Sequence, residues 1–247
     1  ATRDATNQSA FLGRVAQESS LKLRVLSTNE EAYYGYLGAV NALDLRDGYL
    51  IDIGGGSAEV TSIRGRGFVR SFSQPAGVVR FSERYVRSDP ISNRDFNALQ
   101  DAAAASFAGV EWLNDTHGTM LAGIGGTIRT LAEMDQKLSG YPLDRVHGHS
   151  FSRARLDELI ALLRPLTLRQ REDIPGLSRD RADLILAGAV ILQQLMERGR
   201  FAEITVSGQG LREGVFYEHF LVGEQPPLFS DMRSFSVKNL ARLYNYE

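Results

Sequence analysis

The chain has 247 residues, of which 43% are hydrophobic and 23% charged, a composition typical of a globular protein with a sizeable core. It contains no cysteine, which excludes a disulfide scaffold, a thiol nucleophile and a zinc–thiolate site. The net charge of -2 creates no overall field for nucleic acid, and the strongest apolar run, 184–192, is too short to span a bilayer. We expect a cytoplasmic protein without nucleic-acid or membrane partners, which holds any anionic ligand in a local site.

The N-terminal part has the pattern of the edge of an α/β unit. Apolar spacing predicts a helix over 9–19, alternation predicts a strand over 22–26, and a second helical pattern covers 29–42. Thr28 and Glu31 stand three residues apart at the start of this second helix, which is the spacing of a capping box. Spacing alone favours a structural role for Glu31.

A β-rich block follows. Its β-prone runs over 49–53, 58–63 and 68–72 are separated by a glycine-rich turn and by RGRG at 64–67. Three antiparallel strands joined by tight turns are the simplest structure for this pattern. RGRG is then a hairpin turn rather than a nucleic-acid-binding tract.

Beyond residue 92, helical patterns alternate with short strands and glycine turns. We expect helices over about 93–108, from 127, over 152–163, over 178–198 and after 210, and strands at 120–122 and 203–206. Pro226 and Pro227 mark a linker.

Some polar residues in this region permit two interpretations. His147 and His149 form an HxH pair compatible with a metal site, but no third ligand is suggested, so a loop is the favoured interpretation. Arg179 and Arg181 either border a site or solvate the start of a helix, and we favour the second.

Three glycine-rich turns follow predicted strands: DIGGGS at 52–57, GIGGT at 123–127 and SGQG at 207–210. Consecutive glycines let the backbone approach a phosphate, and a turn that opens a helix adds the positive end of the helix dipole. Walker and Rossmann spacings are absent, which disfavours a P-loop NTPase and a dinucleotide oxidoreductase. Each turn alone is explained as a tight turn.

Carboxylates beside the first turn strengthen the prediction of a phosphate site. Asp52 ends one predicted strand and Glu59 lies in the next, so both flank the glycine loop. Phosphoryl transfer needs a phosphate cradle, charge neutralisation and a positioned nucleophile, and such acids hold Mg²⁺ or orient water. On spacing alone the alternative stays open, in which Asp52 caps its own turn and Glu59 lies on a solvated strand face.

Four motifs occur in order along the chain: DIGGGSAE at 52–59, PAGVVRFSERY at 75–85, GIGGTIRTLAEM at 123–134 and SGQGLREGVFYE at 207–218. Together they resemble the exopolyphosphatase and guanosine pentaphosphate phosphatase (Ppx/GppA) family of the actin-like ATPase superfamily. The resemblance implies an α/β, ribonuclease H-like fold with a mixed sheet flanked by helices. It also implies three segments: the end of a partial first lobe over 1–45, a complete second lobe over 46–225, and a linker with the start of a helical module over 226–247.

The resemblance further implies a Mg²⁺-dependent hydrolase that removes terminal phosphate from inorganic polyphosphate or converts guanosine pentaphosphate to tetraphosphate. Water is the nucleophile, Glu31 is the base that activates it, Asp52 and Glu59 bind the metal, and Glu59 also acts in catalysis. A homodimer is a further expectation. The residues expected to hold phosphate are Arg3, Gly54, Gly55, Gly56, Ser57, Arg80, Gly125, Gly126 and Thr127.

The sequence departs from the family pattern in two respects. Thr28 and Tyr33 stand where the family usually has glycine and arginine, which puts the substrate preference in doubt. The DxGxNS-like loop of the first lobe is absent, so we expect a piece of a larger enzyme with little activity by itself. Two alternatives stay open: a regulatory protein that binds polyphosphate or an alarmone without hydrolysis, and a sugar kinase or chaperone-type ATPase of the same superfamily.

Overall fold

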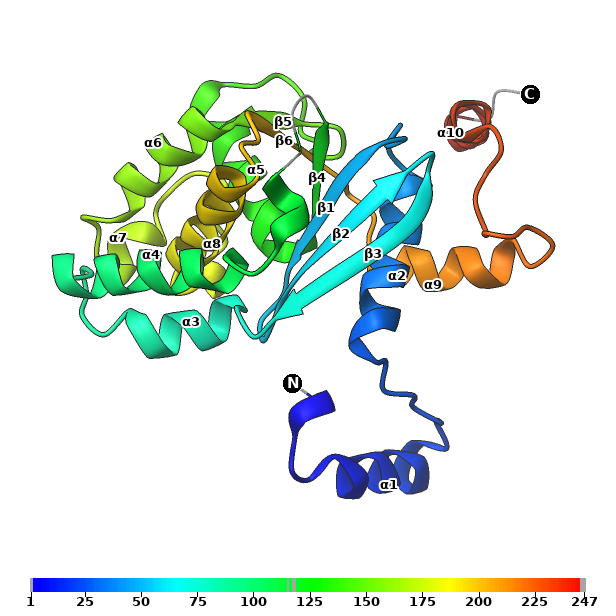
Figure 1. Cartoon of the computed structure of the whole chain (residues 1–247), viewed down its shortest axis with the longest axis horizontal. Helices are drawn as coiled ribbons and strands as arrows, with labels where there is room; N and C mark the ends of the chain where they lie inside the picture. The colour runs from blue at the N-terminus through cyan, green and yellow to red at the C-terminus, as the bar shows by residue number, and fades with distance from the viewer. Residues whose placement is uncertain (1, 115, 117–118, 245–247) are drawn as a thin grey trace.

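The computed structural model describes residues 2–114, 116 and 119–244. Its centre is a six-stranded mixed sheet with the strand order β3-β2-β1-β4-β6-β5, flanked by helices (Figure 1). The strands are β1 (Gly48–Ile53), β2 (Ala58–Arg64), β3 (Gly67–Gln74), β4 (Met120–Ile124), β5 (Ser150–Ser152) and β6 (Glu203–Val206). β1, β2 and β3 form the predicted antiparallel meander, and β1, β4 and β6 run parallel to one another. The predicted α/β fold with a mixed, helix-flanked sheet is confirmed.

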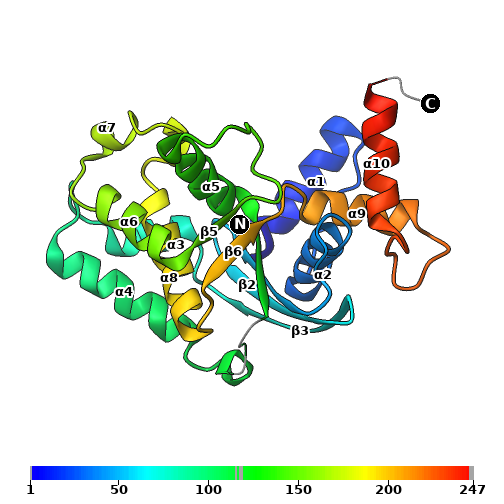
Figure 2. The same cartoon turned by 90° about the horizontal axis from the view of Figure 1, so that it is seen from above.

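The helices lie on both faces of the sheet, as the view from above makes clear (Figure 2). They are α1 (Gln8–Ser19), α2 (Thr28–Val40), α3 (Val78–Tyr85), α4 (Asn93–Phe107), α5 (Gly125–Ser139), α6 (Arg153–Leu163), α7 (Leu168–Arg171), α8 (Ile185–Arg198), α9 (Leu211–Phe220) and α10 (Met232–Leu243), with 3-10 turns at Thr2–Asp4, Glu111–Asn114 and Arg179–Arg181. Helices α3 to α8 gather on one side, and α2 with α9 covers the other. Within the described ranges, no helix combines the length and apolar character needed to cross a membrane.

The two cores on the two faces follow from the alternation of side chains along β1. Tyr49, Ile51 and Ile53 point into the larger core, which α4, α5, α6 and α8 complete. Leu50 points to the opposite face, into the smaller core beneath α2. Because successive strand residues point to opposite faces, Asp52 shares the α2 face with Leu50. This alternation brings a carboxylate of the sheet toward the helix that carries Glu31.

Several sequence predictions are corrected by the structure. Residues 22–26 form no strand, although their side chains alternate. The helix predicted from residue 178 begins as the turn Arg179–Arg181 and becomes α-helical only at Ile185. The helix α3, directly after the meander, was not predicted.

Two side chains, Asn41 and Arg66, hold the segment after α9 by hydrogen bonds. The Nδ2 amide of Asn41 donates to the Pro227 carbonyl at 3.0 Å, and its Oδ1 accepts from the Phe229 N–H at 2.9 Å. The Arg66 guanidinium also donates to the Phe229 carbonyl, at 2.7 Å. The predicted linker is therefore fastened to the fold where it leaves α9.

Candidate active site

A cleft of about 680 Å³ lies between the N-terminal segment, the start of α2 and the β1–β2 hairpin. Its walls include most of the residues that the sequence predicted for the site, drawn from segments far apart in the chain: Arg3, Glu31, Asp52, Gly54, Gly55, Gly56, Ser57, Glu59 and Arg80. Gly125 and Gly126 line a smaller neighbouring hollow of about 290 Å³ instead, beside Asp52 and Gly55. The structure thus brings two of the three glycine turns together around Asp52.

Strand register brings the two acids of the hairpin together. Asp52 and Glu59 are direct partners in the antiparallel pair of β1 and β2, so both side chains lie on the same face. Glu59 is buried, and its Oε1 accepts a hydrogen bond from the Ser73 hydroxyl at 2.8 Å. The alternative in which Glu59 lies on a solvated strand face is wrong.

The surroundings of these carboxylates favour the protonated form of each. Burial, followed by repulsion from Glu59 and Glu31, raises the pKa of Asp52 to about 7, against an opposing attraction from Arg129. Burial also raises the pKa of Glu59, while hydrogen bonds from Ser57 and Ser73 act in the opposite direction. Two neighbouring carboxyl groups repel each other when both are ionised. A bound cation would remove that repulsion, so the pair favours cation binding.

The glycine turn after β1 is fixed on one side and open on the other. Gly54 donates its N–H to the Ser57 carbonyl at 2.9 Å, and the carbonyls of Gly54 and Gly55 accept the N–H groups of Val78 and Val79 at the start of α3. Within the described residues, the N–H groups of Gly55 and Gly56 make no hydrogen bond to the chain. The turn thus caps α3 with its carbonyls and leaves donors for an anion on its other side.

Glu31 reaches the cleft because its neighbour supplies the helix cap. Ser27 is the N-cap of α2, and its hydroxyl accepts from the Glu30 N–H at 3.3 Å. The Glu30 carboxylate in turn accepts the Ser27 N–H at 2.7 Å, which completes the capping box. The predicted box of Thr28 with Glu31 was therefore wrong by one residue. Glu31 is left to pair with Arg3, whose Nη1 lies 2.6 Å from its Oε2.

The second glycine turn opens α5 close to Asp52. Gly125 has a φ of +90°, and a Cβ there would lie 2.6 Å from the Asp52 Oδ1, so a side chain is excluded by both conformation and space. The Arg181 guanidinium lies against Gly126, so a Cβ at residue 126 would overlap it. Arg181 thus borders the site, which corrects the favoured interpretation for this residue, whereas Arg179 is exposed at the start of its 3-10 turn, as that interpretation expected. Thr127 is buried, and its hydroxyl donates to the Ile53 carbonyl at 3.4 Å rather than toward the cleft.

The third glycine turn, Ser207–Gly210, lines a further hollow of about 140 Å³ that also contains Asp52. His147 holds this turn, because its Nδ1 accepts the Gly208 N–H at 3.0 Å while the ring also hydrogen-bonds to the Ala42 backbone. Asp52 consequently lies where three hollows meet, one for each glycine turn. Spacing in the sequence carries no signal for this convergence.

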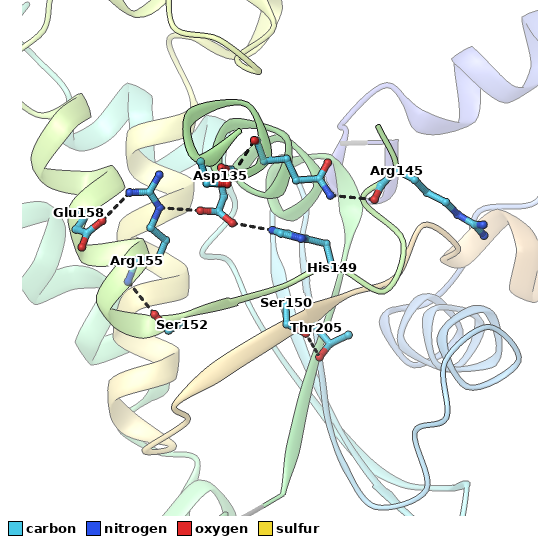
Figure 3. Close-up of polar contacts among 10 residues, drawn as sticks. Asp135, Arg145, His149, Ser150, Ser152, Arg155, Glu158 and Thr205 are labelled. Atoms are coloured by element: carbon cyan, nitrogen blue, oxygen red, sulfur yellow. Dashed lines mark hydrogen bonds and ion pairs between the residues drawn. The ribbon is translucent and has the colours of Figure 1, made fainter. Parts of the chain in front are cut away.

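The two histidines of the HxH pair have separate structural roles. His149 is buried, and its Nε2 lies 2.7 Å from the Asp135 Oδ2 on α5 (Figure 3). The other oxygen of Asp135 accepts from the Arg155 Nε at 2.7 Å, and Arg155 also pairs with Glu158. His149 thus ties the β5 strand to α5 and α6. The loop interpretation of the pair is confirmed.

Tyr33, one of the two departures from the family pattern, lies away from the cleft. Its ring packs among those of Tyr34, Tyr36 and Phe68, and it borders a separate hollow near Glu218. Thr28, the other departure, does line the cleft. Only the threonine can therefore alter the shape of the cleft directly.

The carboxylates of Asp52 and Glu59 are suited to a Mg²⁺ ion whose other ligands come from the phosphate substrate and from water. In the ranges covered by the structure, no group of three or more acidic or histidine side chains is arranged to hold a metal. Mg²⁺, however, is usually bound through one or two carboxylates, with substrate phosphates and water completing its octahedron. Asp52 and Glu59, paired on one face beside the glycine turn, meet that requirement.

Comparison with known proteins agrees with this fold and cleft. A model of the Ppx/GppA phosphatase family matches residues 1–222, and the chain belongs to this family. The motif-based resemblance is therefore confirmed. The match spans nearly the whole described chain and includes every residue of the cleft.

Individual relatives are more distant. The chain is 28% identical to exopolyphosphatase 2 of Mycobacterium tuberculosis, with 87% of this chain and 71% of the relative covered. It is 27% identical to a bifunctional 3-dehydroquinate synthase/phosphatase of Fusobacterium nucleatum, where 80% of this chain aligns with only 30% of the relative's length. The crystal structure of the Aquifex aeolicus member of the Ppx/GppA family superposes with a TM-score of 0.79 at 28% identity, covering 90% of this chain and 72% of that one.

Proposed function

We propose that the chain carries the catalytic cleft of an exopolyphosphatase. The reaction is removal of the terminal phosphate from inorganic polyphosphate, or conversion of guanosine pentaphosphate to tetraphosphate, with water as the nucleophile. The observation that carries this proposal is the meeting of Glu31 with Asp52 and Glu59 beside an open glycine turn, in one cleft. The exopolyphosphatase of M. tuberculosis, which is similar over most of this chain, supports the substrate class.

Glu31 is proposed as the general base. It takes a proton from the attacking water while the water oxygen forms a bond to the terminal phosphorus. The bond from that phosphorus to the bridging oxygen breaks, and the shortened chain leaves with the bridging oxygen. Its position at the start of α2, outside the capping box, leaves the carboxylate directed to the cleft rather than to the helix backbone.

The phosphate cradle is proposed to consist of backbone and guanidinium donors. The N–H groups of Gly55 and Gly56 face the terminal phosphate, Arg3 and Arg80 neutralise it, and Ser57 adds a hydroxyl. Arg181, against Gly126, extends the cradle toward α5. The developing charge of phosphoryl transfer is stabilised chiefly by such fixed donors.

Asp52 and Glu59, paired on one face of the hairpin in the cleft, are proposed as the residues that would hold Mg²⁺. A bound Mg²⁺ supplies charge neutralisation at the scissile phosphate, and it relieves the repulsion between these two carboxylates. Removing the metal with EDTA should therefore abolish turnover without unfolding the chain.

The proposal is tested by phosphate release from long-chain polyphosphate and from guanosine pentaphosphate, each with Mg²⁺ and with EDTA. Release that requires Mg²⁺ and no nucleoside triphosphate supports the hydrolase and argues against a kinase or a chaperone-type ATPase. Binding of polyphosphate without release under any condition, also in a protein to which the DxGxNS-like loop of the first lobe has been added, would instead favour the regulatory protein.

A further inference from the structure

The proposed base and the proposed phosphate ligand Arg3 are bonded to each other. The Arg3 Nη1 lies 2.6 Å from the Glu31 Oε2, which joins the first turn of the chain to the first turn of α2. Their side chains are 29% and 37% exposed, and both line the main cleft. In this arrangement one oxygen of Glu31 is hydrogen-bonded to Arg3, although Glu31 is proposed to accept a proton from water. The same contact engages a guanidinium N–H of Arg3 that is proposed to bind phosphate.

Phosphate competes well for such a guanidinium. Arginine binds carboxylate and phosphate through the same planar fork, and a terminal phosphate offers more oxygens and more negative charge than a carboxylate. An ion pair that is about one-third exposed is also a weak contact, so the pair with Glu31 itself contributes little free energy against the exchange.

The other charges of the cleft favour the same exchange. Repulsion from Glu31 contributes to the raised pKa values of Asp52 and Glu59, whereas Arg3 lowers that of Glu59. Arg3 thus interacts with two carboxylates, Glu31 and Glu59, and a bound phosphate would compete with both for its guanidinium.

We propose that the Arg3–Glu31 ion pair is a substrate-operated latch that holds the base until a phosphate draws Arg3 away. This rests on the proposed function. The terminal phosphate takes the Arg3 guanidinium, and the Glu31 carboxylate is left facing the space where the attacking water must lie. The base is therefore released only when phosphate is present in the cleft.

The latch has a thermodynamic consequence that simple catalysis by Glu31 does not have. If Glu31 and phosphate compete for Arg3, removing the Glu31 charge strengthens phosphate binding, and it does so only while Arg3 is present. Repulsion between Glu31 and phosphate would also strengthen binding on removal of Glu31, but equally with and without Arg3. The two effects are separated by a double-mutant cycle.

The cycle uses the wild-type chain, Glu31→Gln, Arg3→Gln and the double variant. Binding of methylenediphosphonate, a diphosphate analogue that cannot be hydrolysed, is measured by calorimetry in EDTA. We expect Glu31→Gln to tighten binding about threefold to tenfold in the wild-type background, the range expected for a partly exposed ion pair. Arg3→Gln should weaken binding, and adding Glu31→Gln to it should change the affinity by less than about twofold.

Glu30→Gln is the matched control, because it removes the same charge one residue away, where Glu30 pairs with Arg24. It should leave the affinity nearly unchanged. Equal tightening by Glu31→Gln with and without Arg3, or no tightening at all, would overturn the latch. Absence of hydrolysis by the wild-type chain would count against the proposed activity alone, since the binding cycle does not depend on turnover.

Discussion

Glu30 and Glu31 are adjacent and chemically identical, yet the first turn of α2 gives them different tasks. Glu30 occupies the third position of the helix and returns its carboxylate to the Ser27 N–H, while Glu31 pairs with Arg3 in the cleft. The difference depends on which residue is the N-cap. If Thr28 were the N-cap instead, Glu31 would stand at the third position and its carboxylate would be drawn to the helix backbone.

Replacing Glu31 by Gln tests its role as base. The amide cannot accept the water proton, so we expect kcat for polyphosphate to fall by about 10² to 10⁴, the contribution typical of a general base. Substrate binding should be kept or strengthened. Glu30→Gln is the control in steady-state phosphate release, because glutamine also completes a capping box, and its kcat should stay within about twofold. Unchanged turnover in Glu31→Gln would remove Glu31 from the mechanism.

The ionised Asp52 carboxylate lowers the stability of the folded chain, because burial and the neighbouring acids disfavour its charge. Its pKa is about 7 in the folded chain against 3.8 for an ordinary aspartate, so between about pH 4 and 7 the folded state binds more protons than the unfolded state. The free energy of unfolding should therefore decrease as the pH rises through this window. If Asp52 holds the metal as proposed, Asp52→Asn should abolish turnover, and it should raise the free energy of unfolding at pH 8 by about 1 kcal/mol.

Urea unfolding of both proteins at pH 5 and pH 8 checks this prediction. The asparagine variant should gain stability over the wild type at pH 8, and the gain should shrink toward pH 5, where Asp52 is protonated. A variant that is less stable than the wild type at pH 8 would show that the Asp52 carboxylate is well solvated or paired in the folded chain.

At the scale of elements, α2 is placed by unusually close packing on α9. A Cβ at Gly38 would overlap the Gly210 carbonyl, and a Cβ at Gly214 would overlap the Tyr34 carbonyl. The two backbones therefore touch without side chains between them, and α9 determines the position of the helix that carries Glu31. The Tyr34 hydroxyl donates to the Glu218 carboxylate at 2.7 Å, which adds a polar contact to the same interface.

Gly214→Ala should separate these helices. Because the added methyl group meets backbone rather than a movable side chain, we expect a loss of about 2 to 4 kcal/mol in unfolding free energy, together with reduced turnover from displacement of Glu31. Gly13→Ala in α1 is the control, since a Cβ there has open space and alanine favours a helix. Its free energy of unfolding in urea should change by less than about 1 kcal/mol. Equal stability of the two variants would contradict the close packing.

The buried carboxylate of Asp135 joins three elements, since it binds both His149 before β5 and Arg155 on α6 (Figure 3). Asp135→Asn leaves at least one of these partners without its charged acceptor, so we expect a loss of about 2 to 3 kcal/mol. Asp144→Asn breaks an exposed pair with Lys137 and should cost less than about 0.5 kcal/mol, with both variants measured by unfolding in urea. A small effect at Asp135 would mean that the network tolerates an amide.

At the scale of the whole molecule, the two faces of the sheet differ: one carries the main apolar core and the other carries the cleft. The face toward α4, α5, α6 and α8 holds the larger apolar core, and the face toward α2 combines a small core with the cleft acids. The chain after α9 is attached to the second face through Asn41, which is 2% exposed. Movement of α2 is thereby coupled to the segment that leads into α10.

Asn41→Ala should release that segment. Removing both side-chain hydrogen bonds leaves the Phe229 N–H without its acceptor, so we expect faster hydrogen exchange at this amide and a loss of about 1 to 3 kcal/mol. Asn97→Ala, on the exposed face of α4, should leave the exchange at Phe229 unchanged. Identical exchange in both variants would show that Arg66 alone suffices to hold the segment.

Patterns in the sequence predicted the three-strand meander and the glycine turns, because side-chain alternation and turn composition are local properties of consecutive residues, and they placed Asp52 and Glu59 on either side of the first turn. The motifs also identified the family. The folded structure was needed to show that Glu31 meets Arg3 in the cleft, that Arg181 lies against Gly126, and that three hollows meet at Asp52. These contacts depend on how helices and turns pack on the two faces of a sheet. They join residues far apart in the chain, such as Gly126 with Arg181 and Asp52 with the turn at Ser207–Gly210, so spacing in the sequence carries no trace of them.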